Sequence, residues 1–299
     1  MSHRPVLLKE VIEYLNPQKG SVVLDATVNG GGHAMAICGH LGSSGRLVGI
    51  DRDKSLLDSL ISNFQFPISK KNVTLLNGNF RDLDELLKSE GIKKLDAALF
   101  DLGMSSVQLD ESGRGFSFQK DEPLSMNFKS ELGPNDLTAK EILNRWSEED
   151  IYGILKDYGE ERFARGISKK IVERRKRKKF ETTFDLVETI RESVPVFYTK
   201  KRIHFATKTF QALRIEVNDE LGALREGLAK SWVMMSKGGR LVVISFHSLE
   251  DRVVKNFMRD KKNLGEGLVL TKKPVEADDE EKVSNPRSRS AKLRVIEKL

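Results

Sequence analysis

Short apolar runs alternate with helical patterns through the first hundred residues of the chain. The runs stand at Val22–Asp25, Leu47–Asp51, Val73–Asn77 and Leu95–Asp101. Short apolar runs separated by helical segments are typical of parallel strands joined by crossover helices. The pattern therefore predicts an α/β fold built on a parallel sheet.

The alternation stops after Asp101. Residues Gly103–Phe118 are rich in Ser and Gly and show no period, which predicts a long ordered loop over the strand ends. From Asn135 to Val194 nearly every segment has helical periodicity, with helix starts signalled by Thr138 and Ser147. This middle region is predicted to be a helical insert.

The sheet pattern returns near the end of the chain. A long helix is predicted over Asp219–Met235, and Arg240–Phe246 is predicted to be a strand. The runs Leu268–Lys272 and Leu293–Glu297 predict a terminal antiparallel pair, and the acidic segment Asp278–Glu281 predicts a flexible loop. We therefore expect residues 1–110 and 204–299 to form one discontinuous sheet domain, and residues 111–203 to form the helical insert.

The loop after the first strand carries the most specific signal. The sequence Val22–His33 reads VVLDATVNGGGH, and the next strand ends in Asp51. A glycine-rich turn lets a ligand approach backbone amides, and an acid at the next strand tip can accept hydrogen bonds from ribose hydroxyls. The loop lacks G-x-G-x-x-G and fits a D-x-G-x-G-x-G pattern with two glycines replaced, where Asn29 tolerates a left-handed backbone. The spacing favours S-adenosylmethionine (SAM) over a dinucleotide, although a turn without a ligand is the alternative.

Composition narrows the class of protein. The 299 residues include a single cysteine, Cys38, which argues against disulfides and against a Cys-rich zinc site. No apolar stretch is long enough to cross a bilayer, and charges interrupt the N-terminal segment where a signal peptide needs an apolar core. We expect a soluble cytoplasmic protein without a bound metal.

The formal net charge is +7, and the most concentrated basic run is Lys169–Lys179. Such a run is often only a solvated helix face. In a chain that is also expected to bind a nucleoside cofactor, the basic run favours contact with a nucleic-acid phosphate backbone. A nuclear-localisation role is less favoured, because the run lies mid-chain in a helical pattern.

Three polar residues are candidates for the chemistry. Ligands in such folds bind beyond the carboxyl ends of the strands, where the sequence places Asp101, Ser245 and His247. His247 can serve as a base, a phosphate contact or a helix cap. Cys38 lies in the helix behind the glycine loop, where it is badly placed to attack a pyrimidine ring. Direct methyl transfer to nitrogen or oxygen, with a hydrogen-bond acceptor for the developing charge, is the chemistry that remains.

Motifs along the whole chain resemble those of one known protein family. The resemblance rests on nine ordered motifs: HRPVLL (His3–Leu8), DATVNGGGH, GIDRD, FDLGMSSVQLD, RGFSF, YGEERFA, ATKTFQALRIEVNDEL, GGRLVVISFHSLEDR and NPRSRSAKLR. The chain resembles the RsmH (MraW) family of methyltransferases, which act on the N4 amine of a cytosine in small-subunit ribosomal RNA. The resemblance implies a Rossmann-like class I SAM-dependent methyltransferase sheet with an inserted all-helical domain for RNA recognition.

The resemblance also implies a set of cofactor residues. These are Gly31, Gly32, His33, Asp51, Phe80, Asp101 and Gln108. The residues alone had indicated the glycines, Asp51 and Asp101, whereas His33, Phe80 and Gln108 come only from the resemblance. The implied partner is 16S rRNA, modified in its decoding region on assembled small subunits. The oligomeric state stays open, a homodimer included.

The chain departs from the family pattern in several places. Ser125, Asn127 and Phe128 stand in a segment that usually reads PLDMRMD. Phe205 replaces a common Pro and Lys208 a common Arg. These departures lie among the substrate contacts that the resemblance implies, and they leave the implied cofactor residues unchanged.

Other classes of protein are weighed against this interpretation. A nicotinamide-dependent oxidoreductase is disfavoured by the missing G-x-G-x-x-G, and a noncatalytic RNA-binding subunit would not need the cofactor residues. A DNA amino-methyltransferase would carry a D-P-P-Y-type motif where this chain has Asp101–Met104. The alternative function that stays open is a SAM-dependent amino-methyltransferase that acts on another RNA or on DNA.

Overall fold

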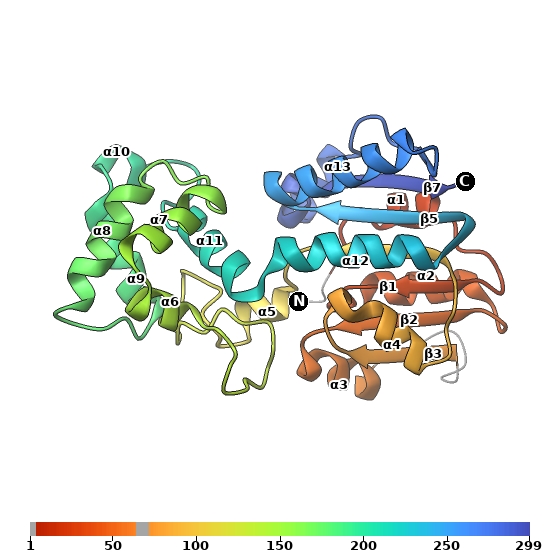
Figure 1. Cartoon of the computed structure of the whole chain (residues 1–299), viewed down its shortest axis with the longest axis horizontal. Coiled ribbons are helices and arrows are strands. Elements are labelled where there is room, and N and C mark those ends of the chain that lie inside the picture. Colours follow the sequence, from red (N-terminus) through yellow and green to blue (C-terminus); the bar gives the residue numbers. More distant parts are fainter. Residues whose placement is uncertain (1–3, 64–71) are drawn as a thin grey trace. The chain divides into compact units, whose positions relative to one another are not determined.

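The computed structural model describes residues 4–63 and 72–299, so His3 of the first motif lies outside the described residues. Within these residues seven strands form one sheet in the order β3-β2-β1-β4-β5-β7-β6 (Figure 1). The strands are β1 (Val22–Asp25), β2 (Arg46–Asp51), β3 (Val73–Asn77), β4 (Leu95–Asp101), β5 (Met235–Ser245), β6 (Gly267–Val269) and β7 (Lys292–Lys298). The first five pair in parallel, and β7 is antiparallel to both β5 and β6. The predicted α/β sheet and its antiparallel terminal pair are confirmed.

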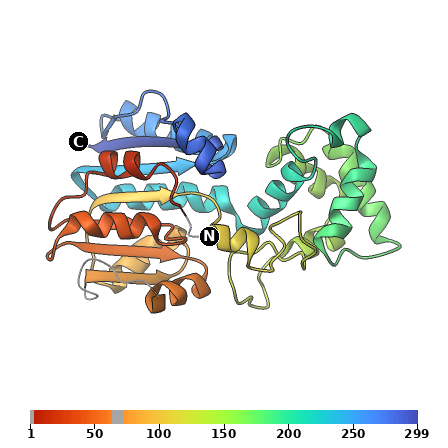
Figure 2. The same cartoon turned by 180° about the vertical axis from the view of Figure 1, so that it is seen from behind.

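Helices cover both faces of this sheet (Figures 1 and 2). One core contains residues of α1 (Leu8–Leu15), α2 (Gly32–Leu41) and α3 (Lys54–Asn63), and it includes Val23 of β1. The other contains residues of α4 (Leu83–Ser89), α12 (Glu220–Met234) and α13 (Ser248–Asn263), and it includes Leu24. Adjacent strand residues point to opposite faces, so a continuous apolar run such as Val22–Leu24 is what a sheet covered on both sides requires.

The chain divides into two compact units. The sheet unit comprises Met1–Ser105 and Leu221–Leu299, and the helical unit comprises Ser106–Glu220. The helical unit contains α5 (Ser106–Asp110), α6 (Ala139–Arg145), α7 (Glu148–Asp157), α8 (Ala164–Arg175), α9 (Thr183–Ser193), α10 (Val196–Thr199) and α11 (Thr207–Asn218). The structure differs from both expected boundaries, at residues 110 and 204. The helix α5 belongs to the helical unit, and so does α11, which packs against α6 and α7.

Two local expectations need correction. The segment Gly103–Phe118, expected to be a loop throughout, contains the short helix α5. The acidic segment Asp278–Glu281, expected to be flexible, begins the helix α14 (Asp279–Ser284). Asp278 caps this helix by accepting a hydrogen bond from the Glu281 amide at 2.7 Å, and the Glu281 carboxylate accepts one from the Leu7 amide at 2.9 Å. Acidic residues thus stabilise a helix N-terminus here rather than a solvated loop.

The remaining elements are the short 3₁₀ helices η2 (Phe80–Asp82) and η3 (Pro286–Ser290). Across the described residues, every helix is too short or too polar to cross a membrane.

Candidate active site

The loop between β1 and α2 is tied to the tips of two neighbouring strands. The hydroxyl of Thr27 accepts a hydrogen bond from the Asp101 amide at 2.7 Å, at the end of β4. The Asn29 amide donates to the Asp51 carboxylate at 2.8 Å, at the end of β2. The Asn29 side chain also donates to the Asp101 carbonyl at 3.3 Å. These bonds fix the loop before any ligand arrives.

The backbone of this loop turns sharply before α2 begins. Asn29 has a φ of 50° and Gly31 a φ of 77°, both in the left-handed region. The expectation that Asn29 can replace a glycine in such a turn is confirmed. Gly32 opens α2, and a Cβ there would come within 3.0 Å of the Pro5 ring. A glycine is needed at residue 32 because the N-terminal segment packs directly over the start of the helix.

The carboxylate of Asp51 is held by backbone amides on both sides. One oxygen accepts from Asn29 at 2.8 Å, and the other accepts from the Asp53 amide at 2.9 Å. The Asp51 carbonyl accepts in turn from Gly78 and from the side chain of Asn77. The side chain is therefore oriented at the tip of β2, where an acid that accepts hydrogen bonds from a ribose is expected.

The buried ring of His33 lies between two oxygen acceptors. Its Nε2 is 2.9 Å from the Val6 carbonyl, and its Nδ1 is 3.4 Å from the Asp101 carboxylate. A carbonyl can only accept, so Nε2 carries a proton. Burial alone would lower the pKa of His33, but the hydrogen bond and the charge of Asp101 outweigh it and raise that pKa. The contact with Asp101 therefore favours the protonated form of the ring.

Two neighbouring carboxylates have oxygen atoms without a partner. The Oδ1 atom of Asp101 and the Oδ2 atom of Asp25 are buried and make no hydrogen bond with any described residue. Burial raises the pKa of Asp25 from 3.8 to about 7, against the opposing charge of His33. Buried polar atoms are nearly always hydrogen-bonded in folded proteins, so unpaired ones at strand ends beside a glycine-rich loop indicate a ligand site.

The other two residues implied by the resemblance lie in different surroundings. Phe80 begins η2 after β3, half-buried, with its ring edge-on to Phe100 at a centroid distance of 5.4 Å. It is in the sheet unit with the glycine loop. Gln108 is buried in α5, which belongs to the helical unit. The structure therefore joins Gly31, Gly32, His33, Asp51, Phe80 and Asp101 in one unit and leaves Gln108 in the other.

Ser245 and His247 have structural partners. The Ser245 hydroxyl donates to the Lys292 carbonyl of β7 at 3.4 Å. His247 is the N-cap of α13: its Nδ1 accepts from the Glu250 amide at 3.4 Å, and the Glu250 carboxylate accepts from the His247 amide at 3.3 Å. Of the roles weighed for His247, the structure supports the helix cap.

Sequence reasoning missed two residues of this site. Asp25 and Thr27 were noted only as parts of the loop pattern, yet one holds a perturbed carboxylate and the other anchors Asp101. A signal was present for Asp25, because an acid that ends a buried apolar strand must face the carboxyl edge of the sheet. For Thr27 there was none, since a hydroxyl in a loop has no characteristic spacing.

Half of the cations in the basic run have partners within the helical unit. Arg174 binds the carboxylates of Asp185 and Glu188, at 2.7 and 2.8 Å. Lys170 pairs with Glu192 at 3.0 Å, Lys178 pairs with Asp185 at 2.9 Å, and Arg175 donates to the Leu143 carbonyl. The basic residues of the run that stay exposed are Lys169, Lys176, Arg177, Lys178 and Lys179.

The residues present fit SAM. A glycine-opened loop, an oriented acid at the β2 tip and a partly exposed aromatic after β3 suit a charged nucleoside. Burial also raises the pKa of the Cys38 thiol to about 12, so the cysteine is not a nucleophile at neutral pH.

Known proteins resemble this chain over its whole length. The model of the MraW methylase family matches residues 1–299. A protein of Persephonella marina named ribosomal RNA small subunit methyltransferase H is 44% identical over the full length of both chains. One of the same name from Thermotoga neapolitana is 46% identical and covers 99% of this chain and 95% of its own length. An rRNA methylase structure from Streptococcus thermophilus is a distant likeness, with 12% identity, 98% and 93% coverage and a TM-score of 0.44. This chain belongs to the MraW methylase family and is a SAM-dependent methyltransferase.

Proposed function

We propose that this protein methylates the N4 amine of a cytosine in the decoding region of 16S rRNA, on the small ribosomal subunit in the cytoplasm. The names of its relatives support the choice of small-subunit rRNA. The observation that carries the chemistry is the buried Asp101 carboxylate, with one oxygen unpaired at the tip of β4. An acceptor there suits transfer to an amine.

The cytosine amine is a poor nucleophile because its lone pair is delocalised into the ring. SAM, when bound, supplies an electrophilic methyl group. As the amine attacks, its nitrogen gains positive charge, which a carboxylate within hydrogen-bond reach stabilises. Asp101 is the acid that we assign to this role, and its unpaired Oδ1 is the atom that accepts from the amine.

His33 has a positioning role in this proposal. Its Nδ1 lies 3.4 Å from the second oxygen of Asp101, and its Nε2 is held by the Val6 carbonyl. When the ring is protonated, it gives the buried carboxylate a hydrogen-bond donor and an opposite charge, which fix the orientation of the carboxylate. A carboxylate fixed in this way is the acceptor that the amine requires.

The experiment is methyl transfer to isolated ribosomal subunits followed by nucleoside mass spectrometry. Small subunits from a strain lacking this gene should gain N4-methylcytidine after incubation with the protein and SAM, whereas subunits from the parent strain should gain none. The appearance of 5-methylcytidine or of methylated adenosine instead, or methylation of DNA alone, would contradict the proposal. Such a result would favour an amino- or carbon-methyltransferase of another specificity.

A further inference from the structure

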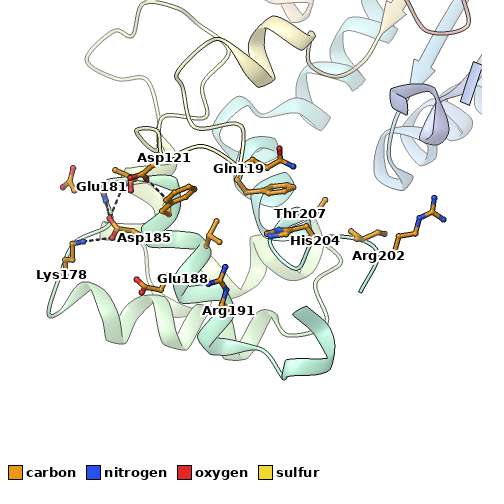
Figure 3. A pocket seen from close by; sticks show the side chains of 15 residues that line it. Gln119, Asp121, Lys178, Glu181, Asp185, Glu188, Arg191, Arg202, His204 and Thr207 are labelled. Carbon is orange, nitrogen blue, oxygen red and sulfur yellow. Dashed lines mark hydrogen bonds and ion pairs between the residues drawn. The ribbon is translucent and has the colours of Figure 1, made fainter. Parts of the chain in front are cut away.

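The helical unit is hollowed by a groove of about 1200 Å³, lined by α9 and by segments near residues 118–121 and 202–207. Figure 3 shows Lys178, Glu181 and Asp185 gathered at one end of the view, His204 and Arg202 at the other, and Arg191 between them. Small-molecule pockets usually measure roughly 300–1,000 Å³. The groove therefore has room for more than one nucleotide-sized group.

Most of the acids at the acidic end of the groove are already neutralised. Asp185 pairs with Arg174 and with Lys178, at 2.7 and 2.9 Å. Glu188 shares Arg174, and Glu181 pairs with Lys140. These contacts neutralise three of the four acids that line the groove, and the fourth, Asp121, accepts a hydrogen bond from the Phe184 amide at 3.4 Å.

The basic end differs because its cations lack carboxylate partners. Neither Arg191 nor Arg202 forms an ion pair with any residue that the structure describes, and both are exposed. The Arg191 guanidinium lies over the Phe205 ring at 5.6 Å from its centroid. Burial and then the charge of Arg191 lower the pKa of His204, so this ring is neutral at pH 7. Two guanidinium groups are thus available to phosphate oxygens.

Aromatic rings adjoin these cations. Phe118 and His204 stack with centroids 4.4 Å apart and planes 1° from parallel, and the Phe205 ring lies 4.2 Å from His204, tilted by 31°. Phe184 also lines the groove and is 47% exposed, although exposing a large aromatic ring to water is unfavourable. Aromatic rings and unpaired guanidinium groups in one groove are the combination that binds single-stranded nucleic acid, with bases stacked and phosphates paired.

We propose that this groove binds an unpaired segment of RNA, with Arg191 and Arg202 on its phosphates and Phe184 stacked on a base. The inference deepens the proposed function by assigning a second RNA contact in the substrate. A duplex does not fit the same chemistry, because its bases are stacked on one another and present no free faces.

The first experiment measures the binding of a short unstructured oligoribonucleotide by fluorescence anisotropy at several salt concentrations. The variant R191Q/R202Q is compared with R225Q/R259Q, which removes two exposed arginines from the sheet unit. If both arginines contact phosphates, the groove variant should lower the slope of log K against log salt by about 1.4, from roughly 0.7 for each contact. Equal slopes for the two variants would overturn the proposal, as would equal affinity of the wild-type protein for a duplex of the same length.

The second experiment tests stacking. The variant F184L should weaken binding about five-fold or more, whereas F184Y should bind like the wild type, because one stacked base contributes roughly 1–3 kcal/mol. Polyglutamate should not compete with the RNA; equal competition would identify a general anion site and overturn the proposal. Methylation of small subunits is measured in a separate assay. A wild-type protein that binds the oligonucleotide but methylates no rRNA would contradict the proposed function, and it would not contradict RNA binding in the groove.

Discussion

The two units bury their acidic side chains in different ways. In the sheet unit, Asp25 and Asp101 end strands with one oxygen each unpaired, and no ion pair joins either to a described Lys or Arg. In the helical unit, the buried Asp185 binds both Arg174 and Lys178 and also accepts from the amides of Glu181 and Thr182.

The pKa values follow this difference. Burial raises the pKa of Asp25 to about 7. Burial acts in the same direction on Asp185, but the hydrogen bond to Lys178 and the two amides outweigh it and lower its pKa. A fully paired acid stabilises its fold, whereas a buried acid with unmet hydrogen bonds marks a place where a ligand completes the set.

The largest expected effect is on stability at Asp25. Its folded-state pKa lies above the unfolded value of 3.8, so the native state holds an extra proton between about pH 4 and pH 7. The free energy of unfolding should therefore fall as the pH rises through this window, by up to about 4 kcal/mol from this group. Urea unfolding of the SAM-free protein across this range measures it.

D25N should remove most of this pH dependence, because asparagine does not titrate. D185N tests the opposite pH dependence in the helical unit. The depressed pKa of Asp185 contributes stability above pH 4 that is lost as the pH falls through its folded value. A D25N protein with an unchanged slope between pH 4 and pH 7 would show that Asp25 is ionised in the native state.

The next effect concerns catalysis at Asp101. D101N keeps the shape of the side chain and removes the charge that would stabilise the amine, so the single-turnover rate should fall about 10²-fold or more. SAM affinity, measured by calorimetry, should fall less than the rate.

S245A is the matched control for D101N, because the Ser245 hydroxyl is already bonded to the Lys292 carbonyl. It should methylate at nearly the wild-type rate. If D101N were as fast as the wild type, Asp101 would be a binding residue at most.

A smaller effect is expected on cofactor binding at Asp51. Removing a charged acceptor that pairs with a ligand typically costs about 1.5–3 kcal/mol, so D51A should bind SAM roughly ten- to a hundred-fold more weakly. The same change frees the Asn29 amide, so thermal unfolding without SAM must be measured alongside. Unchanged affinity in calorimetry would remove Asp51 from the cofactor site.

The sheet could be predicted because its signals are local. The runs ending at Asp25, Asp51 and Asp101 form strands that end at those residues. A short apolar run between turn signals is typical of a buried strand. The second boundary of the helical unit could not be predicted from the sequence. The helix α11 is amphipathic, so its buried face would suit either unit.

The cofactor side of the site was also accessible to sequence reasoning, but only as single residues. Spacing indicated Asp51 and Asp101, while the pairing of His33 with Asp101 depends on where the Val6 carbonyl lies. No periodicity encodes such a contact between distant segments. The groove of the helical unit was missed for the same reason: Arg191 and His204 are thirteen positions apart and meet only after folding.

The basic run gave the least reliable prediction, because composition counts charges and does not show which are paired. Arg174 is 16% exposed and holds two carboxylates, so it serves the fold. R174S should lower the free energy of unfolding by about 1–3 kcal/mol, because Asp185 is left with fewer partners. Urea unfolding measures this loss.

Lys176, Arg177 and Lys179 differ from Arg174 because they are exposed at the end of α8 and beyond it, where phosphates could reach them. The variant K176S/R177S/K179S should keep wild-type stability and SAM affinity, since exposed cations contribute little to either. If each contacts one phosphate, the slope of log K against log salt for small-subunit binding should fall by about 2, from roughly 0.7 for each contact. A slope equal to that of the wild type would make the whole run a solvated helix end. RNA recognition by the helical unit would then depend on the groove, where the arginines have no carboxylate partners.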